Sequence, residues 1–344
     1  MLGMVVRTVG ATLVGALTGA LLAAMPAMAA GTPVKLTLDW KFEGPAAPFL
    51  VALEKGYYAA EGLDVTIDTG AGSTEALPRV ATGAYQFGFG DINSLMKFRD
   101  QNPGLDVKAV MMMYDVPPFA IVGRKSQGVS TWQDLAGKKL GAPPPDGAFA
   151  QWPAFTKVNG IDPASVTIES IGFPVREPML AQGAVDAVFG FSFSVVLNLK
   201  AAGVPEDDIS VILMSKNGLD LYGNAVLVNP DFAKANPELV KGFVKATIKG
   251  VQDTVADPEA AVKTVLARND VAKEEVELAR LKLAIADNIK TEAVVANGFG
   301  DVDMARFAKS VEQLGFAYTF ATPVKPEDVF DPSFLPPKEE RMLP

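Results

Sequence analysis

The sequence predicts an α/β fold of two lobes, each a mostly parallel sheet flanked by helices. Strand-like and helix-like segments alternate from residue 34 to about residue 228, which is the pattern of parallel sheets with helical connections. The strand-like segments form two sets, and a mostly helical stretch follows Pro230. The 314 residues that follow position 30 (344 minus 30) suit two medium-sized domains.

The first set begins with a short strand, a loop and a helix. Pro48 is tolerated in the first turn of this helix, and Glu61-Gly62 ends it. Met111–Met113 belong to the last strand of the set and are expected to be buried, because both faces of a parallel strand are covered. The expected strands are 34–38, 63–67, 86–88 and 107–114. The expected helices are 49–60, 74–82 and a third that carries Leu95, Met96 and Phe98. Asp91 or Asn93 is expected to cap this third helix.

The second set begins near Phe119 and is followed by helices and a tail. The expected strands are 119–122, 139–141, 166–171, 187–189, 209–213 and 224–228, with helices at 146–158, 176–182 and 194–202. After Pro230, helices are expected at 238–255, 259–268, 273–288 and 303–315. The tail from Pro323 is rich in proline and acidic residues, so we expect it to lie extended on the surface.

The first 30 residues have the pattern of a secretory signal peptide. Arg7 precedes an apolar run over 9–24, and Ala27-Met28-Ala29 has the small-x-small form of a cleavage site. Pro26 interrupts the run, which argues against a membrane anchor. Cleavage near Ala29 or Ala30 would release a free, soluble exported protein. Because the chain has no cysteine, we expect no lipid-anchored start.

The composition excludes several classes of function. The chain contains no His and no Cys, so it has no Ser-His-Asp triad, no Cys-His pair and no zinc site with nitrogen or sulfur ligands. Catalysis by carboxylates alone remains open. The net charge is −9 and no Lys or Arg run is present, so nucleic acid is not an expected partner. We expect no metal and no cofactor.

Five loops after predicted strands carry side chains suited to a ligand, because open α/β sheets bind ligands at their strand ends. They are 40–43, 70–74, 90–93, 143–148 and 172–177. The amides of 70–74 either face a ligand or only form a tight turn, and Asp91 either contacts a ligand or only caps its helix. The Arg176 guanidinium either binds a carboxylate or sulfonate of the ligand through two N–H groups, or pairs with Glu177 on the surface. Trp40 either stacks on the ligand or plugs the base of its lobe.

Two further segments have a superficial likeness to catalytic motifs. The loop 143–148 lacks the Lys and Ser/Thr of a nucleotide P-loop. The segment 190–194 resembles a nucleophile elbow, but it lacks the closing glycine and the chain has no histidine to activate the serine. An aromatic wall followed by a helix cap is the better interpretation of 190–194.

Seven segments stand in an order that resembles one protein family. They are "LDW", "PFLVALEKGYYAAEGLDVTI", "GAGST", "FGFGD", "DLAGKKLGAP", "PMLAQGAVDAVFGF" and "GNAVLVNP". The chain from about Val34 to Gly315 is similar to periplasmic solute-binding proteins of ABC importers, in the branch of nitrate, sulfonate, taurine and thiamine-pyrimidine binders. The resemblance implies the type II two-lobed fold, with lobe one formed by 31–118 and 226–344 and lobe two by 119–225. Ligand binding would close the lobes about two crossing segments, near 117–119 and 223–225.

The resemblance implies a monomeric, non-enzymatic receptor that captures a small organic solute and delivers it to an ABC permease with its ATPase. Pyrimidine-binding members carry a His shortly after "DW", where this chain has Ala46. We expect an organic acid or sulfonate held by Arg176 and the 70–74 amides; a neutral or cationic solute held by Glu43 and Asp91, such as a thiamine pyrimidine or another heterocycle, and a pyrimidine-synthase-like enzyme are the alternatives. The candidate ligand-binding residues are Trp40, Lys41, Phe42, Glu43, Gly72, Ser73, Thr74, Asp91, Asn93, Tyr114, Asp146, Phe149, Trp152, Arg176, Phe191 and Tyr222.

Overall fold

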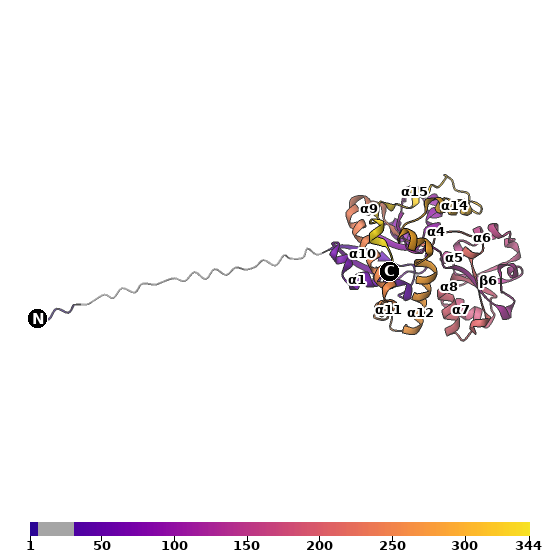
Figure 1. Ribbon diagram of the computed structural model, residues 1–344, viewed down its shortest axis with the longest axis horizontal. Coiled ribbons are helices and arrows are strands. Elements are labelled where there is room, and N and C mark those ends of the chain that lie inside the picture. Colours follow the sequence, from indigo (N-terminus) through magenta and orange to yellow (C-terminus); the bar gives the residue numbers. More distant parts are fainter. Residues whose placement is uncertain (6–30) are drawn as a thin grey trace. The chain divides into compact units, whose positions relative to one another are not determined.

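The computed structural model describes residues 1–5 and 31–344, and residues 31–344 contain two five-stranded sheets (Figure 1). Most of the predicted signal peptide, including its cleavage site, lies outside the described residues. The first sheet consists of β1 (Thr32–Thr37), β2 (Leu63–Asp68), β3 (Phe87–Asp91), β4 (Lys108–Met112) and β10 (Asn224–Val228), and the second of β5 (Phe119–Arg124), β6 (Lys139–Ala142), β7 (Thr167–Ser170), β8 (Ala187–Phe191) and β9 (Ile209–Leu213). No helix in the described part of the chain has both the length and the apolar character needed to cross a membrane.

The two sheets share one topology. The strand orders are β2-β1-β3-β10-β4 and β7-β6-β8-β5-β9. In the first sheet only β10 is antiparallel to its neighbours, and in the second only β5 is. Each sheet is therefore mostly parallel, as predicted. Its single antiparallel strand is the one that the chain enters directly after passing over from the other sheet.

Helices cover both sheets. Those of the first sheet are α1 (Ala47–Glu54), α2 (Tyr57–Ala60), α3 (Ala76–Ala81), α4 (Ile92–Gln101), α9 (Pro230–Ala235), α10 (Pro237–Ala256), α11 (Pro258–Leu266), α12 (Glu274–Ala284), α13 (Glu292–Asn297), α14 (Met304–Gly315) and α15 (Pro326–Val329). Those of the second are α5 (Gly147–Ala150), α6 (Trp152–Asn159), α7 (Phe173–Gln182) and α8 (Ser192–Ala201). Figure 1 shows α5–α8 together around the second sheet, with α8 next to α12 of the first.

Two helices predicted as single elements are each divided. The helix predicted over 49–60 is α1 and α2, because Gly56 between them has φ 70°, a left-handed conformation that interrupts a helix. The helix predicted over 146–158 is α5 and α6, which meet at the buried Gln151. The predicted helices were otherwise located within a few residues of the observed ones.

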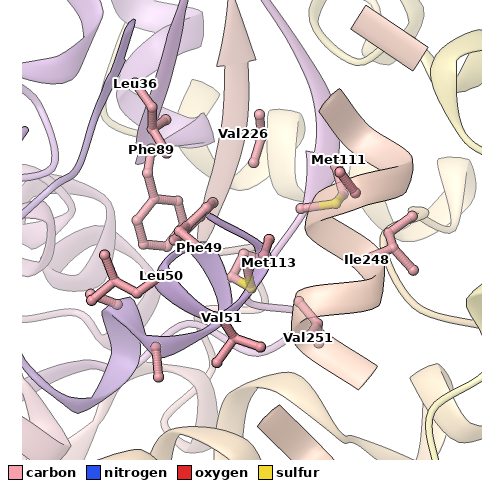
Figure 2. Packing of buried hydrophobic residues seen from close by; sticks show 14 of the residues in the cluster. Leu36, Phe49, Leu50, Val51, Phe89, Met111, Met113, Val226, Ile248 and Val251 are labelled. Carbon is pink, nitrogen blue, oxygen red and sulfur yellow. The ribbon is translucent and has the colours of Figure 1, made fainter. Parts of the chain in front are cut away.

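The core of the first sheet packs against α1 and α10. Figure 2 shows Phe49 beside Phe89, and their ring centroids are 5.3 Å apart. Met111–Met113 have exposed fractions of 0, 2 and 1%, which confirms the predicted buried strand. Apolar burial of this kind is the main favourable contribution to folding.

The tail after Pro323 lies mostly on the surface, as predicted, but it is not simply extended. It contains α15, and Phe330 is fully buried and forms a bridge with Ala109 of β4. The Asp331 N–H donates to the Ala109 carbonyl at 2.9 Å. Phe330 and the buried Val329 hold one part of the tail, and the buried Arg341 holds its end by donating to the Phe299 carbonyl at 3.0 Å. A composition rich in proline and acids conceals these anchors.

The chain passes from the first sheet to the second over residues 113–118 and returns over 214–223. The two crossings are joined directly, since the Gly223 N–H donates to the Tyr114 carbonyl at 2.9 Å. Arg306 of α14 also binds both crossings, through the Asp115 carboxylate (2.9 Å) and the Leu221 carbonyl (3.0 Å). Motion about these crossings remains a prediction.

Candidate ligand-binding cleft

A cleft lies between the strand ends of the two sheets. Loops after β1, β2 and β4 supply one wall, and loops and helix starts after β6, β7 and β8 supply the other. The cleft encloses about 50 Å³, or about 590 Å³ when its open mouth is included. Its lining residues are Leu38, Asp39, Trp40, Lys41, Glu43, Pro45, Ala46, Gly72, Ser73, Phe89, Tyr114, Asp146, Gly147, Phe173, Arg176, Phe191, Phe193 and Ser194.

Close backbone contact holds the two walls together at one side of the cleft. Gly72 has φ 128°, and a Cβ atom at this position would collide with the Pro145 carbonyl oxygen of the opposite wall. Glycine is needed here because it alone tolerates both the conformation and the approach. The loop 70–74 therefore reaches the second sheet as well as lining the cleft.

Aromatic rings dominate the cleft. Trp40 follows β1 and Phe173 begins α7, so they belong to opposite walls; their ring centroids are 4.4 Å apart and their planes are inclined by 60°. Phe191 and Phe193 lie with their ring centroids 6.3 and 6.2 Å from that of Tyr114. Such surfaces bury planar or apolar parts of a ligand with little loss of side-chain entropy.

Arg176 is buried and bound to acids. Its Nε and Nη2 donate to Oε1 of Glu177 at 3.0 and 2.5 Å, and its Nη1 lies 3.5 Å from Oδ2 of Asp146. Arg176 and Glu177 are 4 and 6% exposed, so this is a buried pair and not a surface pair. Two carboxylates thus compensate the guanidinium before any solute enters.

Three acids line the cleft, and they differ in their partners. Glu43 pairs with Arg280 of α12, and Asp146 faces Arg176. Asp39 forms no ion pair with any residue in the described part of the chain; its Oδ2 accepts a hydrogen bond from Asn224 Nδ2 at 3.0 Å. Burial raises the pKa of Asp39 to about 7, and the charge of Glu43 adds to the increase.

The only other cation in the lining is Lys41, which is solvent-exposed. Its ammonium lies 5.2 Å from the centroid of the Trp40 ring. Within residues 31–344 it forms no ion pair. Lys41 is therefore the cleft cation that is available to an acidic group at the mouth.

Nine of the sixteen predicted site residues line the cleft: Trp40, Lys41, Glu43, Gly72, Ser73, Tyr114, Asp146, Arg176 and Phe191. The other seven lie elsewhere: Phe42, Thr74, Asp91, Asn93, Phe149, Trp152 and Tyr222. Asp91 caps α4 by accepting the Asn93 N–H at 3.1 Å, and it also accepts from Gln151 Nε2 at 2.7 Å. Thr74 Oγ1 donates to the Pro145 carbonyl at 3.3 Å. These polar groups join elements and do not face the cleft.

The four aromatic residues outside the lining support the packing. Phe149 and Trp152 pack against Phe189 of β8, with ring centroids 5.2 and 5.4 Å away. The Tyr222 hydroxyl accepts a backbone N–H, 2.8 Å away, from the residue that precedes α14. Phe42 packs against the core of the first sheet. Aromatic residues in strand-end loops are thus divided between the cleft and the core, and composition does not separate the two roles.

Several lining residues are not among the predicted site residues, notably Asp39, Phe173 and Phe193. Asp39 stands beside Trp40 in the "LDW" segment, directly after β1, so its position at a strand end was the available signal. Phe173 belongs to the loop 172–177, in which Arg176 is the only predicted site residue. Phe193 belongs to the segment 190–194, which supplies aromatic residues to the cleft wall. The helix cap expected in this segment is absent, because α8 begins after Phe191 without a side-chain cap.

Asp39 is expected to make stability depend on pH. The folded protein keeps the Asp39 proton up to a pKa of about 7, whereas the unfolded chain loses it near the ordinary value of 3.8. The resulting stabilisation is complete below about pH 4 and is lost as the pH rises through about 7. In urea unfolding, the free energy of unfolding of the wild type relative to Asp39→Asn should fall across this window; a constant difference would contradict the raised pKa.

Comparison with known proteins places the chain in a family. A family model described as "NMT1/THI5 like" matches residues 45–261. The chain belongs to the NMT1/THI5-like family. The resemblance to solute-binding proteins that include thiamine-pyrimidine binders is thereby confirmed.

Curated relatives of this NMT1/THI5-like protein include binding proteins and enzymes. The riboflavin-binding protein RibY of Chloroflexus aurantiacus is 28% identical over 84% of this chain and 82% of the relative. The formylaminopyrimidine-binding protein of Halalkalibacterium halodurans is 27% identical over 86% of this chain and 89% of the relative. The 4-amino-5-hydroxymethyl-2-methylpyrimidine phosphate synthase of Legionella pneumophila is 26% identical over 66% of this chain and 71% of the relative.

Solved structures support the fold of this NMT1/THI5-like protein. The alkanesulfonate-binding protein SsuA of Xanthomonas axonopodis superposes with a TM-score of 0.66 at 14% identity, over 89% of this chain and 99% of that one. At this identity the likeness establishes the fold alone. The two-lobed fold of periplasmic binding proteins is therefore confirmed.

Proposed function

We propose that this protein is a solute receptor that binds a planar, nitrogen-containing heterocycle between Trp40 and Phe173. The observation that carries the proposal is the contact of these two rings, with centroids 4.4 Å apart, across a cleft whose walls come from different sheets. Aromatic faces on both sides suit a flat solute better than a compact anion. Relatives named for riboflavin and formylaminopyrimidine support this class of solute.

Binding of this kind requires the two walls to move. Trp40 and Phe173 are in contact, so a ring that enters between them must first part them. The crossings at 113–118 and 214–223 are the segments about which the walls would separate and close. A solute that touches both walls favours the closed arrangement by its differential affinity for it.

The surroundings of Arg176 favour a heterocycle over an organic acid or sulfonate. Its guanidinium is already bound by Glu177 and Asp146. An acidic group placed there would meet two carboxylates as well as the arginine, and like charges at close range are unfavourable. An acidic substituent on the solute would instead lie at the mouth, near the exposed Lys41.

The partners and location follow from the same proposal. Solute-binding proteins of this fold serve ABC importers, so we infer that a membrane-embedded permease with its ATPase receives the solute, and that the protein works as a periplasmic monomer. A single chain supplies both walls of the cleft, which supports function as a monomer. The structural likeness to SsuA supports the fold on which this inference rests.

A pyrimidine-synthase activity is the alternative, because synthases are among the relatives. The chain has no histidine, and Ala46, at the position where the pyrimidine-binding proteins it resembles carry one, contributes only a methyl group to the cleft. Incubation of the purified protein with candidate substrates should give no turnover. A new product that requires the protein would establish the alternative.

Mass spectrometry of co-purified solute tests the proposed function. Protein purified from its native periplasm is denatured, and the released small molecules are compared with those from the Trp40→Ala variant prepared in parallel. We expect a planar nitrogen heterocycle that is enriched in the wild type. Enrichment of an aliphatic sulfonate or carboxylate would overturn the proposed solute class.

A further inference from the structure

We propose that Asp39 selects the solute by accepting a hydrogen bond from an N–H group on the edge of the heterocycle. The inference rests on the proposed function, since it concerns the solute held in the same cleft. The aromatic rings alone would accept many flat solutes. Asp39 is the polar group that would distinguish among them.

Asp39 is held in place at the cleft by a buried polar group. Asn224 Nδ2 donates to Asp39 Oδ2 at 3.0 Å and to Ser73 Oγ at 3.1 Å. Asn224 and Ser73 are 0 and 3% exposed, so they are fixed by the surrounding structure. A carboxylate has about four acceptor positions. The Asn224 amide fills one of them, which leaves capacity for a donor on a solute.

Asp39 differs from the other acids of the cleft in the partner of its carboxylate. Glu43 and Asp146 lie against arginines, whereas Asp39 has no cationic partner in the described part of the chain. Apolar Leu38 and Phe89 line the cleft with it. A solute N–H would therefore satisfy the one acid of the cleft lining that the protein leaves without a cation.

The same arrangement explains why solutes without an N–H would be rejected. A ring that carries no donor would exclude water from Asp39 and leave its carboxyl group without a partner. Sites built to hydrogen-bond a substrate discriminate strongly for this reason. Above about pH 7 Asp39 is ionised, and a hydrogen bond to its charged carboxylate then contributes about 1.5–3 kcal/mol, which corresponds to a preference of roughly 10- to 150-fold.

Two pairs of probes test the proposal by isothermal titration calorimetry at a pH well above 7, where Asp39 is ionised. One pair is riboflavin and riboflavin methylated at its ring N–H; the other is 4-amino-5-hydroxymethyl-2-methylpyrimidine and its 4-dimethylamino analogue. In at least one pair the wild type should bind the N–H form roughly 10- to 150-fold more tightly. Asp39→Leu should reduce this ratio to about one, whereas Asp64→Leu, at an exposed acid on the edge strand β2, should leave it unchanged.

The outcomes separate this inference from the proposed function. Equal affinity for both members of each pair in the wild type, or a preference that survives in Asp39→Leu, would overturn the role of Asp39 while leaving a heterocycle receptor intact. Failure of the wild type to bind any of the four probes or other flat heterocycles would overturn the proposed function itself. Should Asp39→Leu not fold by circular dichroism, Asp39→Asn serves in its place, and its ratio should lie between one and the wild-type value; a ratio equal to wild type would count against Asp39.

Discussion

Replacement of Trp40 with alanine is expected to weaken binding of the heterocycle on the order of 10- to 100-fold. The indole forms one face of the cleft opposite Phe173, and a stacked aromatic pair contributes about 0.5–1.5 kcal/mol beyond the apolar area it buries. Trp40 is only partly buried, so the melting temperature of the ligand-free protein should change little. Calorimetric titration and thermal unfolding of the same preparations measure both quantities.

Trp132→Ala is the matched control for this prediction, because Trp132 is also partly buried but does not line the cleft. It should leave affinity unchanged. Phe173→Ala should weaken binding as Trp40→Ala does, and the double variant should lose less than the sum, because both rings hold the same solute. Lower stability with intact affinity in Trp40→Ala would instead show that Trp40 is a structural plug.

Replacement of Arg280 with leucine is expected to cost about 3–5 kcal/mol of unfolding free energy, because it leaves buried acids without their cation. Arg280 is 2% exposed; it pairs with Glu43, and its Nε lies 3.5 Å from Glu277. Its Nη2 also donates to Asn198 of α8 at 3.1 Å, which links the two walls beside the cleft. Urea unfolding measures the loss, and solute affinity should fall with it.

Arg268→Leu is the control for the loss of an arginine. Arg268 is solvent-exposed, and its Nε lies 3.9 Å from Glu54. An exposed pair of this kind contributes about 0–1 kcal/mol. Adding Glu43→Gln to Arg280→Leu should restore part of the lost stability by removing one unpaired charge. Equal effects of the Arg280 and Arg268 variants would contradict the role of the buried ion-pair cluster.

The fold was predictable because its signals are local. Alternation of apolar strands with helical segments identified two mostly parallel sheets, and runs such as Met111–Met113 correctly indicated buried strands. The breaks at Gly56 and Gln151 and the anchoring of the tail through Phe330 were missed. The roles of Gln151, which donates to Asp91, and of Phe330, which forms a bridge with Ala109, are set by contacts distant in sequence. The break at Gly56 is instead a local effect of a glycine with positive φ.

The site was predictable in position but not in chemistry. The cleft lies among the predicted strand-end loops, and Trp40 is part of its lining. The alternatives for Arg176 could not be separated, because Asp146 lies 30 residues away in sequence and approaches only in the folded structure. For Asp39, neither the absence of a cation nor the contact with Asn224 is visible in a sequence.

Calorimetric titration of the wild type against a mixed panel of solutes tests the central claim most directly. The panel holds riboflavin and 4-amino-5-hydroxymethyl-2-methylpyrimidine beside taurine, an alkanesulfonate and nitrate, at one pH and ionic strength. We predict saturable binding of a flat heterocycle and no measurable heat with the anions, because Arg176 is already bound by Glu177 and Asp146. Saturable binding of a sulfonate or nitrate, with none of the heterocycles, would contradict a cleft built around Trp40 and Phe173.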